Sequence, residues 1–280
     1  MSIFDIFKKT STPVVGKPEM AKPDSHDDAA VKAGVEEESL SQVAPKNIGK
    51  LDMVIAFDTT GSMARYIGAV RQQVSELVPR LFKDNEDLRL GIVAFGDYCD
   101  MKNAQEFGSA YQCLKPTANE NDIIRFINES SNTSGGDGDE FYELVLRKIV
   151  DETPWREDSQ KAILLISDAE PHPLGYSFED RVVDNRIDWK EEARKAAAKM
   201  IKIDTVTITG LPWYKELSAM TNGISVPFST GGKTGDLIEA ATLARGSMKS
   251  RSKFDELESK CVDEEMKAVY RSYRKDRLDI

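Results

Sequence analysis

The stretch LDMVIAFDTTGSM, residues 51–63, decides the fold of this chain. It opens with a short apolar run, which is far too brief to cross a membrane and is typical of a strand buried inside a parallel sheet. The run ends at Asp58, and a cluster of hydroxyl residues and a glycine follows before an amphipathic helical segment begins at Met63. Because ligand sites in open α/β sheets form beyond the carboxyl ends of strands, this turn is a candidate binding site.

Asp58, Thr60 and Ser62 alternate along this turn, so their side chains can point the same way. One carboxylate and two hydroxyls make an all-oxygen set, which suits a hard cation such as Mg²⁺ or Mn²⁺ better than zinc. Ser and Thr are also favourable N-cap residues, so an ordinary helix cap explains the same residues. The turn alone therefore leaves a metal site and a helix cap as equal alternatives.

Composition restricts the classes of protein to which the chain can belong. Its 280 residues can hold one sizeable α/β domain with appendages, and a net charge of −10 argues against nucleic acid as the main partner. No apolar run approaches the roughly 20 residues of a transmembrane helix, and the first residues, MSIFDIFKK, lack the features of a secretory signal. Three cysteines without paired spacing are typical of a reducing compartment. We therefore expect a cytoplasmic protein.

Strand and helix patterns alternate over residues 50–247. Strands are expected at 51–57, 88–95, 105–114, 161–167, 203–209 and 223–228. This alternation predicts an α/β fold with a doubly wound, mostly parallel sheet flanked by helices. Before it, residues 1–9 can form a short amphipathic segment that docks on a partner, on a membrane surface or on its own domain, and residues 10–49 have the composition of a disordered linker.

Residues 248–280 are heavily charged but carry apolar residues at roughly helical spacing. This pattern predicts a C-terminal amphipathic helix. Such a helix can pack back on the domain, or it can offer a surface to a partner or to a second copy of the chain.

Two further loops carry acidic residues toward the turn after the first strand. Asp137 lies in a glycine-rich loop that opens a helix, and Asp168 ends the apolar run at 161–167. In a doubly wound sheet these loops can meet at one edge with Asp58, and their carboxylates would repel one another unless a divalent cation neutralised them. The three loops together favour the metal site over the helix cap.

The order of these elements resembles the von Willebrand factor A domains, which are Rossmann-like, over about residues 50–247. Their metal-ion-dependent adhesion site is written Asp-x-Ser-x-Ser, then a Thr or Asp in a second loop, then an Asp after the central strand. Here the first element is Asp58-Thr59-Thr60-Gly61-Ser62 and the third is Asp168. We match Asp137 to the second element, with Thr133 and Ser134 as alternatives.

The segments DTTGSM, GDYCD, GGDGDE and SDAEPHP further resemble the intracellular A domains found beside alpha-kinases. The resemblance implies that Thr60 and Ser62 ligate Mg²⁺ directly, with Mn²⁺ or Ca²⁺ as alternative ions. It implies that Asp58 and Asp168 act directly or through water, and that an acidic side chain of a protein partner completes the coordination shell.

The expected function is that of a non-enzymatic adaptor or scaffold, because the turn offers recognition chemistry without a nucleophile–base pair. A metal-dependent hydrolase or phosphatase is the first alternative. A structural subunit, held in a larger assembly by the N-terminal segment or the C-terminal helix, is the second. His172 lies close enough to Asp168 in sequence to reach the second shell of the ion or to bond its own loop.

Overall fold

The computed structural model describes residues 49–103, 106–178, 183–184, 186–227 and 233–278. The segment predicted at 1–9 and all but the last residue of the linker predicted at 10–49 lie outside the described residues. The fold of the described part begins with the first strand of the main sheet.

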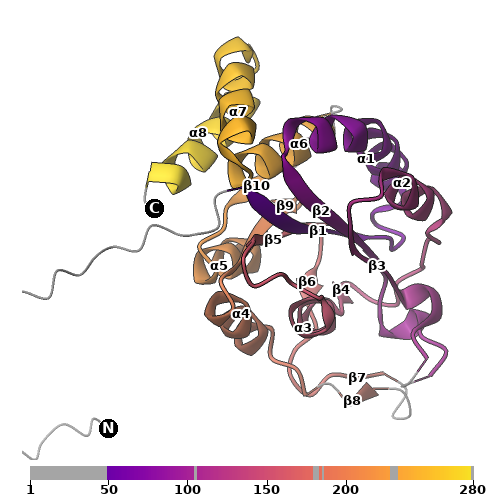
Figure 1. Ribbon diagram of the computed structural model, residues 1–280. Helices are drawn as coiled ribbons and strands as arrows, with labels where there is room; N and C mark the ends of the chain where they lie inside the picture. Colours follow the sequence, from indigo (N-terminus) through magenta and orange to yellow (C-terminus); the bar gives the residue numbers. More distant parts are fainter. Residues whose placement is uncertain (1–48, 104–105, 179–182, 185, 228–232, 279–280) are drawn as a thin grey trace, which may run out of the picture. The chain divides into compact units, whose positions relative to one another are not determined.

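Six strands form the main sheet, shown in Figure 1, in the order β10-β9-β5-β1-β2-β3. All neighbouring strands are parallel except β2 and β3. The six strands are β1 (Lys50–Asp58), β2 (Asp87–Phe95), β3 (Tyr111–Thr117), β5 (Gln160–Ser167), β9 (Ile201–Thr207) and β10 (Ser225–Pro227). The predicted doubly wound, mostly parallel sheet is confirmed, and β1 lies between β2 and β5 near its centre.

Helices cover both faces of the sheet (Figure 1). One face carries α1 (Ala64–Asp84), α2 (Glu120–Glu129) and α6 (Thr234–Arg245), and the other carries α3 (Tyr142–Glu152), α4 (Trp189–Ala198) and α5 (Pro212–Met220). Along β1, Ile55 and Phe57 enter the first core while Val54 and Ala56 enter the second. Burial on both faces explains why residues 53–57 of this strand form an unbroken apolar run instead of an alternating one.

The C-terminal tail forms two helices, α7 (Met248–Lys260) and α8 (Glu264–Leu278), where one continuous helix was expected. The break is stabilised by Asp263, whose Oδ1 accepts the backbone N–H of Met266 at 2.9 Å. Phe254 and Tyr270 pack edge to face with ring centroids 5.0 Å apart, inside the core that α6 also lines. Of the two alternatives for the tail, the structure therefore shows packing on its own domain.

A buried ion pair joins this helical layer to the sheet. Arg245, at the end of α6, donates from Nη2 to Oδ1 of Asp204 in β9 at 2.6 Å, and both side chains are almost fully buried. The Arg245 guanidinium also lies over the ring of Tyr273 in α8, at 5.6 Å from its centroid. Arg245 of α6 therefore contacts both Asp204 of the sheet and Tyr273 of α8.

The antiparallel strand β3 begins later than the predicted range of 105–114. Residues Gly108–Ala110 form a 3₁₀ turn before it, and Gly108 adopts a φ of +55°. A left-handed residue at the start of a tight turn is incompatible with an extended strand, so the strand begins only at Tyr111.

Two short strands join the loops at the carboxyl edge of the sheet. β4 (Asp139–Glu140) pairs with β6 (Glu170–Pro171) in parallel, and the register sets Glu140 opposite Pro171. A second small pair, β7 (Ser177–Phe178) and β8 (Val183–Asp184), follows. None of the described helices has the length and apolar character that crossing a bilayer requires.

Candidate functional site

The turn after β1 brings the three alternating oxygen groups into contact. Thr60 donates to Asp58 Oδ1 twice, from its backbone N–H at 2.8 Å and from its hydroxyl at 2.7 Å. The hydroxyls of Thr60 and Ser62 are 3.3 Å apart. Asp58 is fully buried, whereas Ser62 is exposed. The site therefore has a buried carboxylate at its base and a hydroxyl at its open side.

Asp168 joins this group from the neighbouring strand. It follows β5 directly, and the Ser62 hydroxyl donates to its Oδ1 at 3.1 Å. Beneath them, the Tyr142 hydroxyl donates to Asp58 Oδ2 at 2.9 Å and accepts a hydrogen bond from Ser167. The first and third loops predicted from the sequence therefore meet, and α3 supplies a tyrosine that holds Asp58 in place.

Ser62 does not cap the helix that follows it. The N-cap position of α1 is Met63, which makes no side-chain capping bond, and the Ser62 hydroxyl is directed to Asp168 instead. The helix-cap interpretation of this turn is therefore wrong for Ser62, and its hydroxyl belongs to the acidic cluster.

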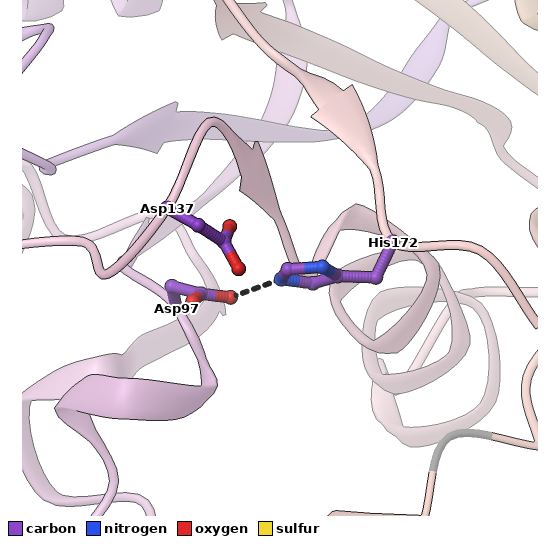
Figure 2. Close-up of side chains that lie close together, drawn as sticks. All are labelled: Asp97, Asp137 and His172. Atoms are coloured by element: carbon purple, nitrogen blue, oxygen red, sulfur yellow. Dashed lines mark hydrogen bonds and ion pairs between the residues drawn. The ribbon is translucent and has the colours of Figure 1, made fainter. Parts of the chain in front are cut away.

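Asp137 lies in a different cluster from the one in which the sequence placed it. Its carboxylate gathers with Asp97 and His172, as Figure 2 shows, and the Tyr176 hydroxyl donates to its Oδ2 at 3.0 Å. Among the described residues, it has no hydrogen bond to Thr60, Ser62 or Asp168. His172 Nε2 is 2.7 Å from Asp97 Oδ1, so its hydrogen bond runs to the loop after β2.

The other two second-loop candidates serve to dock the loop. The Thr133 hydroxyl is 2.8 Å from that of Thr59, and the Ser134 carbonyl accepts the N–H of Gly61 at 3.1 Å. These contacts press the second loop against the turn after β1. The hydroxyl of Thr133 is thereby directed to Thr59, away from the alternating residues of the turn.

Glu140 is the second-loop acid that lies beside Thr60, and sequence reasoning missed it. A Cβ atom added at Gly135 would lie 3.0 Å from Glu140 Oε1 and 3.2 Å from Thr60 Cβ. The side chains of Glu140 and Thr60 therefore both lie against Gly135. Glu140 is 3% exposed, and its Oε2 has no hydrogen-bond partner among the described residues. One feature of the sequence could have indicated Glu140. It directly precedes the apolar residue Phe141, which is buried, and the last residues of a loop that leads into a buried helix lie close to the core.

The carboxylates of this group are difficult to ionise together. Burial raises the pKa of Asp58 to about 7, although hydrogen bonds from Thr60 and Tyr142 oppose the rise. Burial, followed by the charges of Asp58 and Asp97, raises the pKa of Glu140 to about 10, and burial also raises the pKa of Asp168. A divalent cation would remove this repulsion, since it adds positive charge among oxygen ligands.

The residues present fit a hard cation. Carboxylates of Asp58, Glu140 and Asp168 and hydroxyls of Thr60 and Ser62 form an all-oxygen donor set, and within the described part of the chain nothing donates to the buried Oε2 of Glu140. Buried polar atoms of native proteins nearly always have a partner, so this oxygen indicates a missing ligand.

Comparison with known proteins identifies the region that carries this group. A sequence profile of the von Willebrand factor type A domain matches residues 52–237, which include every residue of the cluster. No curated protein matches the chain.

Proposed function

The chain belongs to the von Willebrand factor type A domain family, and from this we propose that it is a metal-dependent protein-interaction module. Asp58, Thr60, Ser62, Glu140 and Asp168 bind Mg²⁺, with Mn²⁺ or Ca²⁺ as alternatives, and the face that holds the ion engages a protein partner. Domains of this family are typically interaction modules, which supports the second half of the proposal.

The observation that carries the proposal is the convergence of buried acids on two hydroxyls. Asp58, Glu140 and Asp168 all have raised pKa values, each with burial as the main cause. A site with this excess of negative charge is most stable when a cation occupies it. In this proposal Glu140 takes the role that the sequence assigned to Asp137.

Each residue of the cluster has a distinct task. The hydroxyls of Thr60 and Ser62 supply neutral ligands, and Asp168 orients Ser62 through the 3.1 Å hydrogen bond. Tyr142 and the Thr60 N–H fix the position of Asp58. The bound ion supplies a positive centre to which an acidic side chain of the partner is attracted, and Ser62 lies at the exposed side where that partner arrives.

We propose an adaptor or scaffold role inside the cell, in line with the motifs that resemble the intracellular A domains beside alpha-kinases. The hydroxyls of Thr60 and Ser62 bond the carboxylates of Asp58 and Asp168, which agrees with a role as metal ligands. The three cysteines are free, which agrees with a reducing compartment.

The test is the change in melting temperature when Mg²⁺ is added to the full chain after EDTA treatment. We expect a rise for the wild type and none for Ser62→Ala or Asp168→Asn. Ser131→Ala is the matched control, because Ser131 is an exposed hydroxyl residue near the start of the second loop. Absence of any Mg²⁺ response in the wild type, or an undiminished response in Ser62→Ala, would overturn the proposal.

Two further measurements separate the alternatives. Partner capture with and without EDTA tests whether binding depends on the ion. A phosphatase screen with Mg²⁺ or Mn²⁺ tests the hydrolase, which would show turnover that Asp168→Asn abolishes. Capture that is unaffected by EDTA and by Ser62→Ala favours a purely structural subunit.

A further inference from the structure

Asp97, Asp137 and His172 come from three separate loops and meet at one point, as Figure 2 shows. Asp97 follows β2, Asp137 precedes β4, and His172 follows β6. One imidazole nitrogen and two carboxylate oxygens, one from each residue, all lie within 4.8 Å of one another. This spacing is compatible with three ligands around a single metal ion.

Burial divides this cluster into a closed side and an open side. Asp97 is 0% and His172 2% exposed, while Asp137 is exposed. Asp97 Oδ1 lies against His172, but Asp97 Oδ2 has no hydrogen-bond partner among the described residues. The nearby Cys99 thiol is at most a weak donor to it. A fully buried carboxylate oxygen with at most a weak thiol donor is free to accept a ligand, and the exposed Asp137 leaves an entry path for one.

Tyr176 orients two of the three residues at once. Its ring stacks on the His172 imidazole with centroids 3.7 Å apart, and its hydroxyl donates to Asp137 Oδ2 at 3.0 Å. Outer contacts of this kind fix the direction of ligands in metal sites. The side chains of His172 and Asp137 are therefore held in fixed orientations by Tyr176.

Acidic side chains outnumber basic ones around Asp97, Asp137 and His172. Asp139 and Glu140 lie in the same loop as Asp137, and both interact electrostatically with Asp97. One imidazole faces this group of carboxylates. A divalent ion would restore the balance.

We propose that Asp97, Asp137 and His172 form a second metal site that takes a divalent transition-metal ion, for which Zn²⁺ is the probe. Imidazole nitrogen is a ligand for zinc and similar ions, whereas Mg²⁺ prefers oxygen. Three protein ligands leave a fourth position open for water or for a partner's side chain, as in zinc sites that exchange a ligand.

Binding requires a small movement. Tetrahedral zinc with bonds of about 2.0–2.1 Å separates neighbouring ligand atoms by roughly 3.3 Å. The 2.7 Å contact between His172 and Asp97 therefore opens slightly, and the ion replaces the proton shared by the pair. A neutral imidazole then keeps its proton on Nδ1, whereas an imidazolium releases one on binding.

The site is tested by Zn²⁺ titration of the EDTA-treated full chain, with excess Mg²⁺ present to occupy the cluster around Asp58. We expect uptake equimolar with the chain, and we expect Asp137→Asn to weaken the affinity by at least about 100-fold, because even outer-contact changes cost about 10–100-fold. Asp137 is exposed, so this variant keeps the fold. Glu129→Gln, which changes an exposed acid at the end of α2, is the matched control and retains binding.

Tyr176→Phe keeps the stacked ring but loses the hydroxyl, and we expect an affinity loss of about tenfold. Replacement of Zn²⁺ by Co²⁺ provides a second readout, an absorption spectrum of nitrogen and oxygen ligands without a thiolate band. Equal Zn²⁺ affinity in wild type and Asp137→Asn, or no uptake by the wild type, overturns the inference. A Mg²⁺ response that persists in that case leaves the proposed function intact, so the two failures are distinguishable.

Discussion

The buried carboxylate of Asp58 should make the stability of the metal-free protein depend on pH. Its pKa rises from 3.8 to about 7 in the folded state, mainly because of burial. Between these values the folded protein holds a proton that the unfolded chain has lost, so the free energy of unfolding falls as pH rises through this window and levels off above it. At roughly 1.4 kcal/mol per pKa unit, the loss is about 4 kcal/mol.

Mg²⁺ should remove this loss, because the ion stabilises the ionised carboxylate. The rise in melting temperature on adding Mg²⁺ is therefore expected to be small at pH 5 and larger at pH 8, where about 4 kcal/mol corresponds to roughly 10 °C for a domain of this size. In Asp58→Asn, an amide oxygen still accepts from Thr60, but no charge remains. This variant should lose both the Mg²⁺ response and its share of the pH dependence.

The assay is thermal unfolding followed by circular dichroism, in EDTA and in Mg²⁺, at both pH values. Asp158→Asn is the control, since Asp158 is exposed and pairs with Lys50 at the surface. A Mg²⁺-induced shift of equal size at pH 5 and pH 8 would refute the role of Asp58. So would an undiminished shift in Asp58→Asn.

Three other variants test the surrounding structure. Burial raises the pKa of Glu143 from 4.5 to about 7, so the free energy of unfolding should fall by about 3 kcal/mol as pH rises between these values. Glu143→Gln should abolish this fall, which urea unfolding from about pH 4 to 8 measures. Arg245→Met leaves Asp204 buried without its partner and should lower the unfolding free energy by about 3–5 kcal/mol; an unchanged urea midpoint would contradict this. Gly135→Ala should destabilise the protein by at least about 1 kcal/mol and weaken the Mg²⁺ response, because φ is +70° and a Cβ would crowd the site, while Gly138→Ala, with open space around it, should not.

The sheet could be predicted from sequence because its strands are buried on both faces. Residues 53–57 of β1 and 162–166 of β5 are continuously apolar, and an acidic residue, Asp58 or Asp168, follows each run within two positions. Such runs indicate both the strand and the end at which a site forms. The meeting of Ser62 with Asp168 follows from the adjacency of these two strands.

The second loop could not be predicted in the same way. The family resemblance matched Asp137 to the second element, but loop conformation decides which side chain turns toward Thr60. A left-handed glycine at 135 and the short pairing of β4 with β6 bring Glu140 inward and leave Asp137 with His172. These are long-range and backbone effects that carry no periodic signal in the sequence.

The ion pair between Asp204 and Arg245 sets a limit on how this domain can be divided. The family profile ends at residue 237, yet Arg245, Phe254 and Tyr273 lie beyond it and complete the core. A chain that ended at the profile boundary would stop inside α6. Asp204 would remain buried without the positive charge of Arg245, and apolar core surface would be exposed to water. The boundary of the family profile therefore does not mark the boundary of the compact folded unit, which includes α7 and α8.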